Sequence, residues 1–74
     1  MHMQIVSIYF DTMVFTFIIV SNGGEKYYSK KSYTFENECT KASLHVGYSQ
    51  FGDDIDYIAI LKNDVIVRMF SKDC

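Results

Sequence analysis

The chain has 74 residues, a formal net charge of −2, 49% apolar residues and no proline. This composition excludes a disordered tail and, because nucleic-acid-binding domains are usually clearly basic, argues against a dedicated nucleic-acid binder. A domain of this size buries only roughly 60% of the surface that its unfolded chain exposes. We therefore expect one domain over residues 1–74 with a small core. Met1 and His2 are compatible with a cloning remnant.

The cysteine content and the apolar runs bear on the compartment. Cys39 and Cys74 are the only cysteines, whereas secreted domains this small usually carry several disulfides. The longest apolar run, Met13–Val20, is far shorter than the ~20 residues that a membrane-spanning helix needs. No signal-peptide pattern is visible at the start of the sequence. The expected location is the cytoplasm, with both thiols free.

Two aromatic and β-branched runs, Gln4–Phe10 and Met13–Val20, predict the first two strands. Asp11 and Thr12 would form the turn between them. Such a hairpin pairs Phe10 with Met13. Its core face would carry Val6, Ile8, Phe10, Met13, Phe15, Phe17 and Ile19.

The segment Ser21–Gly24, "SNGG", is the strongest turn signal because Asn and Gly tolerate positive φ. The following residues, "EKYYSKK", predict a third strand. Its register stays open, since a two-residue and a three-residue loop place Tyr27 and Tyr28 on opposite faces.

Apolar residues then recur at helical spacing, which predicts one helix from about Glu36 to Tyr48. The expected buried stripe consists of Phe35, Cys39, Ala42 and Val46. Thr34 or Asn37 would cap its start and Gly47 or Gly52 its end.

The closing stretch "DYIAILKNDVIVRMF", from Asp56 to Phe70, predicts a hairpin with a two-residue turn at Asn63 and Asp64. One face would carry Ile58, Ile60, Val65, Val67 and Met69. The other would carry Tyr57, Ala59, Leu61, Ile66, Arg68 and Phe70. Both faces are apolar, so the question is what covers the second one.

The predicted fold class is α+β: a mainly antiparallel sheet of four to five strands, in the order β-β-β-α-β-β, with one short helix on one face. One helix shields only one face of such a sheet. A large apolar patch on a monomer usually marks an interface. Either another chain covers the second face, or the sheet coils and covers itself with a loop or its tail.

Catalytic and metal-binding patterns are absent from the sequence. Cys39 and His45 are six positions apart, which places them on nearly opposite sides of a helix. The acidic residues Asp53, Asp54 and Asp56 lack the glycine and the distant glutamate of a calcium loop. Two cysteines and one credible histidine give no zinc ligand set. We expect no enzyme activity, cofactor or metal.

Two polar features suggest binding. Basic residues interleaved with aromatic ones suit single-stranded nucleic acid or an acidic partner, but lysines also protect an edge strand from aggregation. This patch comprises Lys26, Tyr27, Tyr28, Lys30 and Lys31. Arg68, between apolar neighbours, fits either an interface hot spot or a side chain that extends its charge to water.

In size, hairpin–helix–hairpin order, aromatic strands and the closing "YIAILKNDVIVRMF", the chain resembles the small proteins that bacteriophages make to block host machinery, such as anti-CRISPR proteins and phage antitoxins. The resemblance implies a non-enzymatic inhibitor that binds a host protein. The second apolar face supplies the residues expected at the contact: Tyr57, Leu61, Ile66, Arg68 and Phe70. The alternatives are a homodimeric structural or accessory module and a small single-stranded nucleic-acid binder.

Overall fold

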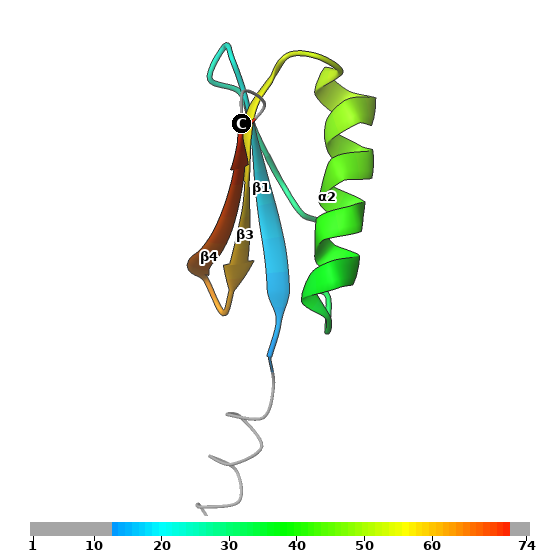
Figure 1. Ribbon diagram of the computed structural model, residues 1–74, viewed down its shortest axis with the longest axis vertical. Coiled ribbons are helices and arrows are strands. Elements are labelled where there is room, and N and C mark those ends of the chain that lie inside the picture. The colour runs from blue at the N-terminus through cyan, green and yellow to red at the C-terminus, as the bar shows by residue number, and fades with distance from the viewer. Residues whose placement is uncertain (1–12, 72–74) are drawn as a thin grey trace, which may run out of the picture.

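The computed structural model describes residues 13–71, which form two antiparallel hairpins joined by one helix. The elements are β1 (Phe15–Ser21), β2 (Lys26–Tyr28), α2 (Glu36–Phe51), β3 (Ile55–Lys62) and β4 (Val65–Ser71). The strands form one sheet in the order β2-β1-β3-β4, antiparallel throughout. Helix α2 lies on one side of this sheet and packs against β1 and β3 (Figure 1). The α+β prediction is confirmed.

Strand β1 provides the centre of the core. Phe15, Phe17 and Ile19 are buried, as the alternation predicted, and they point to the side covered by α2. We call this side the helix face and the opposite side the open face. Phe17 and Ile60 are paired across β1 and β3, and both are almost fully buried.

Both edges of β1 are occupied. Strand β3 pairs with it from Phe15 to Ser21. The other edge pairs with β2. Beyond β2, the Ser29 N–H donates to the carbonyl of Phe17, and Tyr33 forms a β-bridge with Phe15. The predicted strand Gln4–Phe10 lies outside the described residues.

The register of β2 separates the two neighbouring tyrosines. Tyr27 lies opposite Ile19 and packs against the core, whereas Tyr28 lies opposite Ile18 and is 59% exposed. The turn before β2 places Gly24 at φ 92°, a conformation that glycine adopts without strain. The Gly24 N–H donates to the carbonyl of Ser21.

Helix α2 packs closely on the sheet through small residues. Cys39, Ser43 and Gly47 are its buried residues, and they follow one another at i, i+4 spacing. A Cβ built on Gly47 would lie 3.0 Å from Cδ1 of Ile55. The predicted stripe is therefore wrong in part: Ala42 and Val46 are only partly buried, and Phe35 is 63% exposed.

The ends of the helix also differ from the prediction. Phe35 is the N-cap residue and makes no side-chain cap hydrogen bond, so neither Thr34 nor Asn37 caps the helix. The helix continues through Gly47 to Phe51 and ends at Gly52, whose φ of 59° and ψ of −123° suit glycine. The predicted end at Gly52 is correct.

The β3–β4 hairpin has the predicted two-residue turn, with Asn63 and Asp64 at φ 51° and 72°. Beyond it the register shifts by one residue: Leu61 pairs with Ile66, but Ile60 pairs with Arg68, so Val67 is left without a direct partner. This bulge moves the following residues to the other face of the sheet.

The bulge corrects the predicted faces. Arg68 and Phe70 lie opposite Ile60 and Ile58 and therefore belong to the helix face. Met69 lies opposite Ala59 on the open face. The expectation that Arg68 and Phe70 share a face with Leu61 is wrong.

Candidate functional site

An apolar row crosses the open face from one edge of the sheet to the other. Tyr28 of β2 lies beside Ile18 of β1, Ile18 beside Ala59 of β3, and Ala59 beside Met69 of β4. Tyr28 and Met69, at the ends of the row, are 59% and 55% exposed, whereas Ala59 is buried between larger neighbours. Helix α2 lies on the other side of the sheet (Figure 1).

Two further rows flank the first. One runs from Thr16 through Leu61 to Ile66, which is 52% exposed, and the other joins Val20 to Tyr57. Three strands of about seven residues and the three-residue strand β2, spaced about 4.8 Å apart with about 3.3 Å per residue, give this face a total footprint of roughly 400 Å². The footprint includes the buried residues Val20 and Ala59. The largest apolar patch of a typical monomer is of about this size and often has a function.

The open face is also hollowed. A cavity of about 280 Å³ lies beside Tyr28 and is lined by side chains of β1, by Ser29 and Leu61, and by Asp64 of the hairpin turn. Its lining combines apolar residues with the polar residues Thr16, Ser29 and Asp64. A hollow of this kind on an apolar face can receive an anchor side chain of a protein partner.

The five residues predicted for the contact do not form one surface. Tyr57, Leu61 and Ile66 lie together on the open face, but Arg68 and Phe70 lie on the helix face. The Arg68 Nε donates to Oε2 of Glu36 at 2.6 Å. Met69 was assigned to the other face, and Tyr28 was assigned to the lysine and tyrosine patch and not to this surface. The register of β2 and the bulge in β4 are not readable from the alternation pattern.

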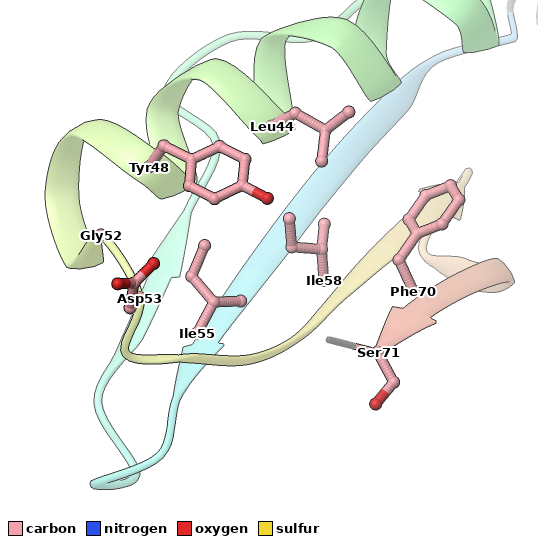
Figure 2. Close-up of a pocket in the computed structure, with 8 residues that line it drawn as sticks. All are labelled: Leu44, Tyr48, Gly52, Asp53, Ile55, Ile58, Phe70 and Ser71. Carbon is pink, nitrogen blue, oxygen red and sulfur yellow. The ribbon is translucent and has the colours of Figure 1, made fainter. Parts of the chain in front are cut away.

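A groove separates α2 from β4 on the helix face (Figure 2). Leu44 and Tyr48 form its helix wall, Phe70 forms the opposite wall, and Ile55 and Ile58 form the floor. It encloses about 220 Å³, less than the ~300–1,000 Å³ of a typical small-molecule site. An apolar cavity of ~150 Å³ is known to hold benzene. The groove thus suits one large apolar side chain.

The lysine and tyrosine patch is divided by the sheet. Tyr27 faces the core and Tyr28 faces the open side. The Nζ of Lys30 lies 6.0 Å from the centre of the Tyr27 ring, and the Nζ of Lys31 lies 5.2 Å from that of Tyr33. Both lysines therefore lie over rings of their own chain, where a stacked base would have to compete with them.

The thiol and the imidazole are far from a catalytic arrangement. Cys39 is fully buried, and His45 is exposed on another side of α2. Burial raises the pKa of the Cys39 thiol to about 11, and the Glu36 carboxylate adds to the shift. Such a thiol stays protonated at neutral pH and is a poor nucleophile.

Among residues 13–71 no group of three His, Cys, Asp or Glu side chains is placed to hold a metal ion. The Asp54 carboxylate accepts a hydrogen bond from the Asn22 amide. In the same part of the chain no helix has both the length and the apolar character needed to cross a bilayer.

Comparison of the chain with protein-family models, with curated proteins and with solved structures gives no match.

Proposed function

We propose that this chain is a non-enzymatic binding module that blocks or modulates a protein complex through its open face. The observation that carries the proposal is the apolar row from Tyr28 to Met69, which crosses all four strands beside a hollow of about 280 Å³. Aromatic residues and methionine are enriched in protein interfaces. The flanking residues Tyr57, Leu61 and Ile66 extend the same surface.

The character of the face supports a protein partner over a small molecule. It is wide and shallow, and the described residues at its centre carry no charge. A face of roughly 400 Å² falls short of the ~800 Å² that each partner buries in a standard interface. A partner would therefore also contact the margins, where Lys26 and Asp64 supply polar groups.

The small size and the hairpin–helix–hairpin order favour an inhibitor of the kind that phages use against host defence, of which anti-CRISPR proteins are one example. Such an inhibitor needs no catalytic group, because occupying a site on the host protein is sufficient. In the described residues the buried Cys39 and the distant His45 give no support to a catalytic role.

Affinity capture with two matched tyrosine variants tests the proposal. Tyr28 on the open face and Tyr48 on α2 are exposed to similar extents, 59% and 64%. A lysate of the host cell, treated with nuclease, should yield one stoichiometric protein with the wild type and with Tyr48→Lys. Tyr28→Lys should lose it. Equal retention by both variants, or loss of all binding on nuclease treatment, would contradict the proposal.

A further inference from the structure

The two edge strands of the sheet, β2 and β4, differ in how well they are protected from pairing with another chain. Strand β2 is three residues long, and three lysines, Lys26, Lys30 and Lys31, lie in it or directly after it. Short length and lysines are common ways of preventing an edge from pairing with another chain. Strand β4 has seven residues, and within residues 13–71 it pairs only with β3.

Strand β4 is apolar and exposed along its length. Val65, Ile66, Val67 and Met69 are 47–64% exposed. Its one charged residue, Arg68, is paired with Glu36 of its own chain. In the part of the chain that the structure describes, the bulge at Val67 is the one other protective feature of this edge, and it leaves Arg68–Ser71 in regular pairing.

We propose that β4 pairs with β4 of a second copy in an antiparallel, two-fold arrangement that joins two sheets into one of eight strands. A two-fold axis requires the same strand on both sides, so each contact occurs twice. Two copies meet without like-charge repulsion, because the charge of Arg68 is already matched by Glu36. The pairing uses the backbone edge of β4, whereas the proposed function uses side chains of the open face; Ile66 and Met69 belong to both, and the Tyr28 and Val65/Val67 variants tell the two surfaces apart.

The faces of β4 select the register. Directly opposite residues in an antiparallel pair point to the same face. Ile66 and Met69 belong to the open face, and Phe70 belongs to the helix face. Val65 also belongs to the helix face, because its partner Lys62 lies opposite the buried Phe15 of β1. The register that aligns Ile66 with Met69 of the second copy, and Val65 with Phe70, keeps like faces together over the whole strand.

The helix does not obstruct this pairing. Helix α2 packs on β1 and β3, so it lies about two strand spacings from the proposed two-fold axis, which lies at the outer edge of β4. The two helices would then be roughly 19 Å apart, well beyond the 8–10 Å of packed helices. Figure 1 shows β4 on the far side of β3 from β1, with its outer edge turned away from α2. The interface is one strand wide, so we expect a dimer that dissociates on dilution.

Cysteine cross-linking tests the register. In a Cys74→Ser background, Ile66→Cys with Met69→Cys places the paired Cα atoms about 4.5–5.5 Å apart between copies, within the range of a disulfide. Within one chain the bulge places Ile66 and Met69 opposite Leu61 and Ala59, two residues or about 7 Å apart, at the limit for a disulfide, so the dimer is scored by its molecular mass and not by loss of thiols. Oxidation should give a covalent dimer. Val65→Cys with Met69→Cys, on opposite faces, is the matched control and should give at least tenfold less.

Sedimentation over a range of concentrations tests the edge itself. Val65→Lys with Val67→Lys, at two exposed positions, should weaken the dimer at least tenfold, whereas Tyr28→Lys at the other edge should leave it unchanged. A wild type that is monomeric at every concentration would overturn the proposal. A dimer lost in Tyr28→Lys and kept in the valine variant would also overturn it, because the copies would then meet through their open faces.

Discussion

The Nε atom of Arg68 lies 2.6 Å from Oε2 of Glu36, so an ion pair links the outer strand β4 to the first turn of α2. Glu36 is also well placed as an acidic residue at the positive end of the helix dipole. The two side chains are 55% and 32% exposed. The pair is therefore expected to orient Arg68 more than to stabilise the fold.

A double-mutant cycle with Glu36→Gln and Arg68→Met measures that contribution. Because both side chains are partly in water, we expect a coupling free energy of about 0.2–1 kcal/mol in denaturant unfolding. The coupling should decrease in high salt. A coupling above about 2 kcal/mol that is insensitive to salt would show instead that the pair fixes β4 to the helix.

Gly47 offers a test of how closely the helix packs. Gly47→Ala gains about 1 kcal/mol in helix propensity, but its Cβ would lie 3.0 Å from Cδ1 of Ile55. That atom is the end of a side chain bordering the groove, so it has room to move. We expect Gly47→Ala to be neutral or slightly stabilising in thermal unfolding.

The larger variant Gly47→Val is the matched comparison. Its methyl groups would also press on Ile19 and Ile58, whose Cδ1 atoms are each 3.6 Å from the added Cβ. Overpacking of this kind costs about 1–3 kcal/mol. If Gly47→Ala destabilised the protein as much as Gly47→Val, the groove would not be available to Ile55.

The turn between β3 and β4 can be improved. Asn63 and Asp64 both have positive φ, and such turns favour Asn followed by Gly. Asp64→Gly should raise the free energy of unfolding by about 0.5–1 kcal/mol, because glycine adopts this conformation without strain.

Asn63→Gly is the control for that variant. The Oδ1 atom of Asn63 accepts a hydrogen bond from the Val14 N–H at 3.1 Å, and glycine cannot replace it. We expect a loss of about 1 kcal/mol. A loss of stability in Asp64→Gly as well would mean that the aspartate side chain holds the turn.

The thiol of Cys39 should make stability depend on pH in the alkaline range. Its pKa is raised from 9.0 to about 11 in the folded chain, so folding favours the protonated form. This contribution is complete below pH 9 and is lost as the pH rises toward 11. It should amount to roughly 2 kcal/mol.

The reference protein for this prediction is Cys39→Ala. It keeps every other ionisable group of the wild type, so the contributions of those groups cancel in the comparison. The difference in unfolding free energy between wild type and variant should shrink from pH 8 to pH 11. In a Cys74→Ser background, alkylation of the Cys39 thiol at pH 7 should be slow in native buffer and fast in denaturant. A constant difference across this range would contradict the raised pKa.

The fold class, the buried side of β1 and the β3–β4 turn are predictable from the sequence, because period-two alternation and positive-φ residues are local signals. The buried stripe of α2 is not. Ser43 and Gly47 do not count as apolar residues, yet their small size lets the helix approach the sheet. Ser43 is fully buried, and its hydroxyl donates to the carbonyl of Thr40.

The candidate site was predicted only in part. Tyr57, Leu61 and Ile66 share the open face as expected, because the extra residue of the bulge lies in β4 after Ile66 and leaves the alternation of β3 unbroken. A single bulge at Val67 moves Arg68 and Phe70 to the other side, and no local pattern in "DVIVRMF" indicates it. Tyr28 joins the site through the register of β2, which depends on hydrogen bonds to β1 rather than on the turn sequence.

The strand order has a consequence for the speed of folding. The β1–β2 and β3–β4 pairs are local, but the central β1–β3 seam joins distant parts of the chain; Val14 and Asn63, which bond at its end, are 49 positions apart. Closing so large a loop costs entropy before any contact compensates for it. Formation of this seam, with α2 packing over it, should therefore limit the folding rate, while both hairpins form earlier.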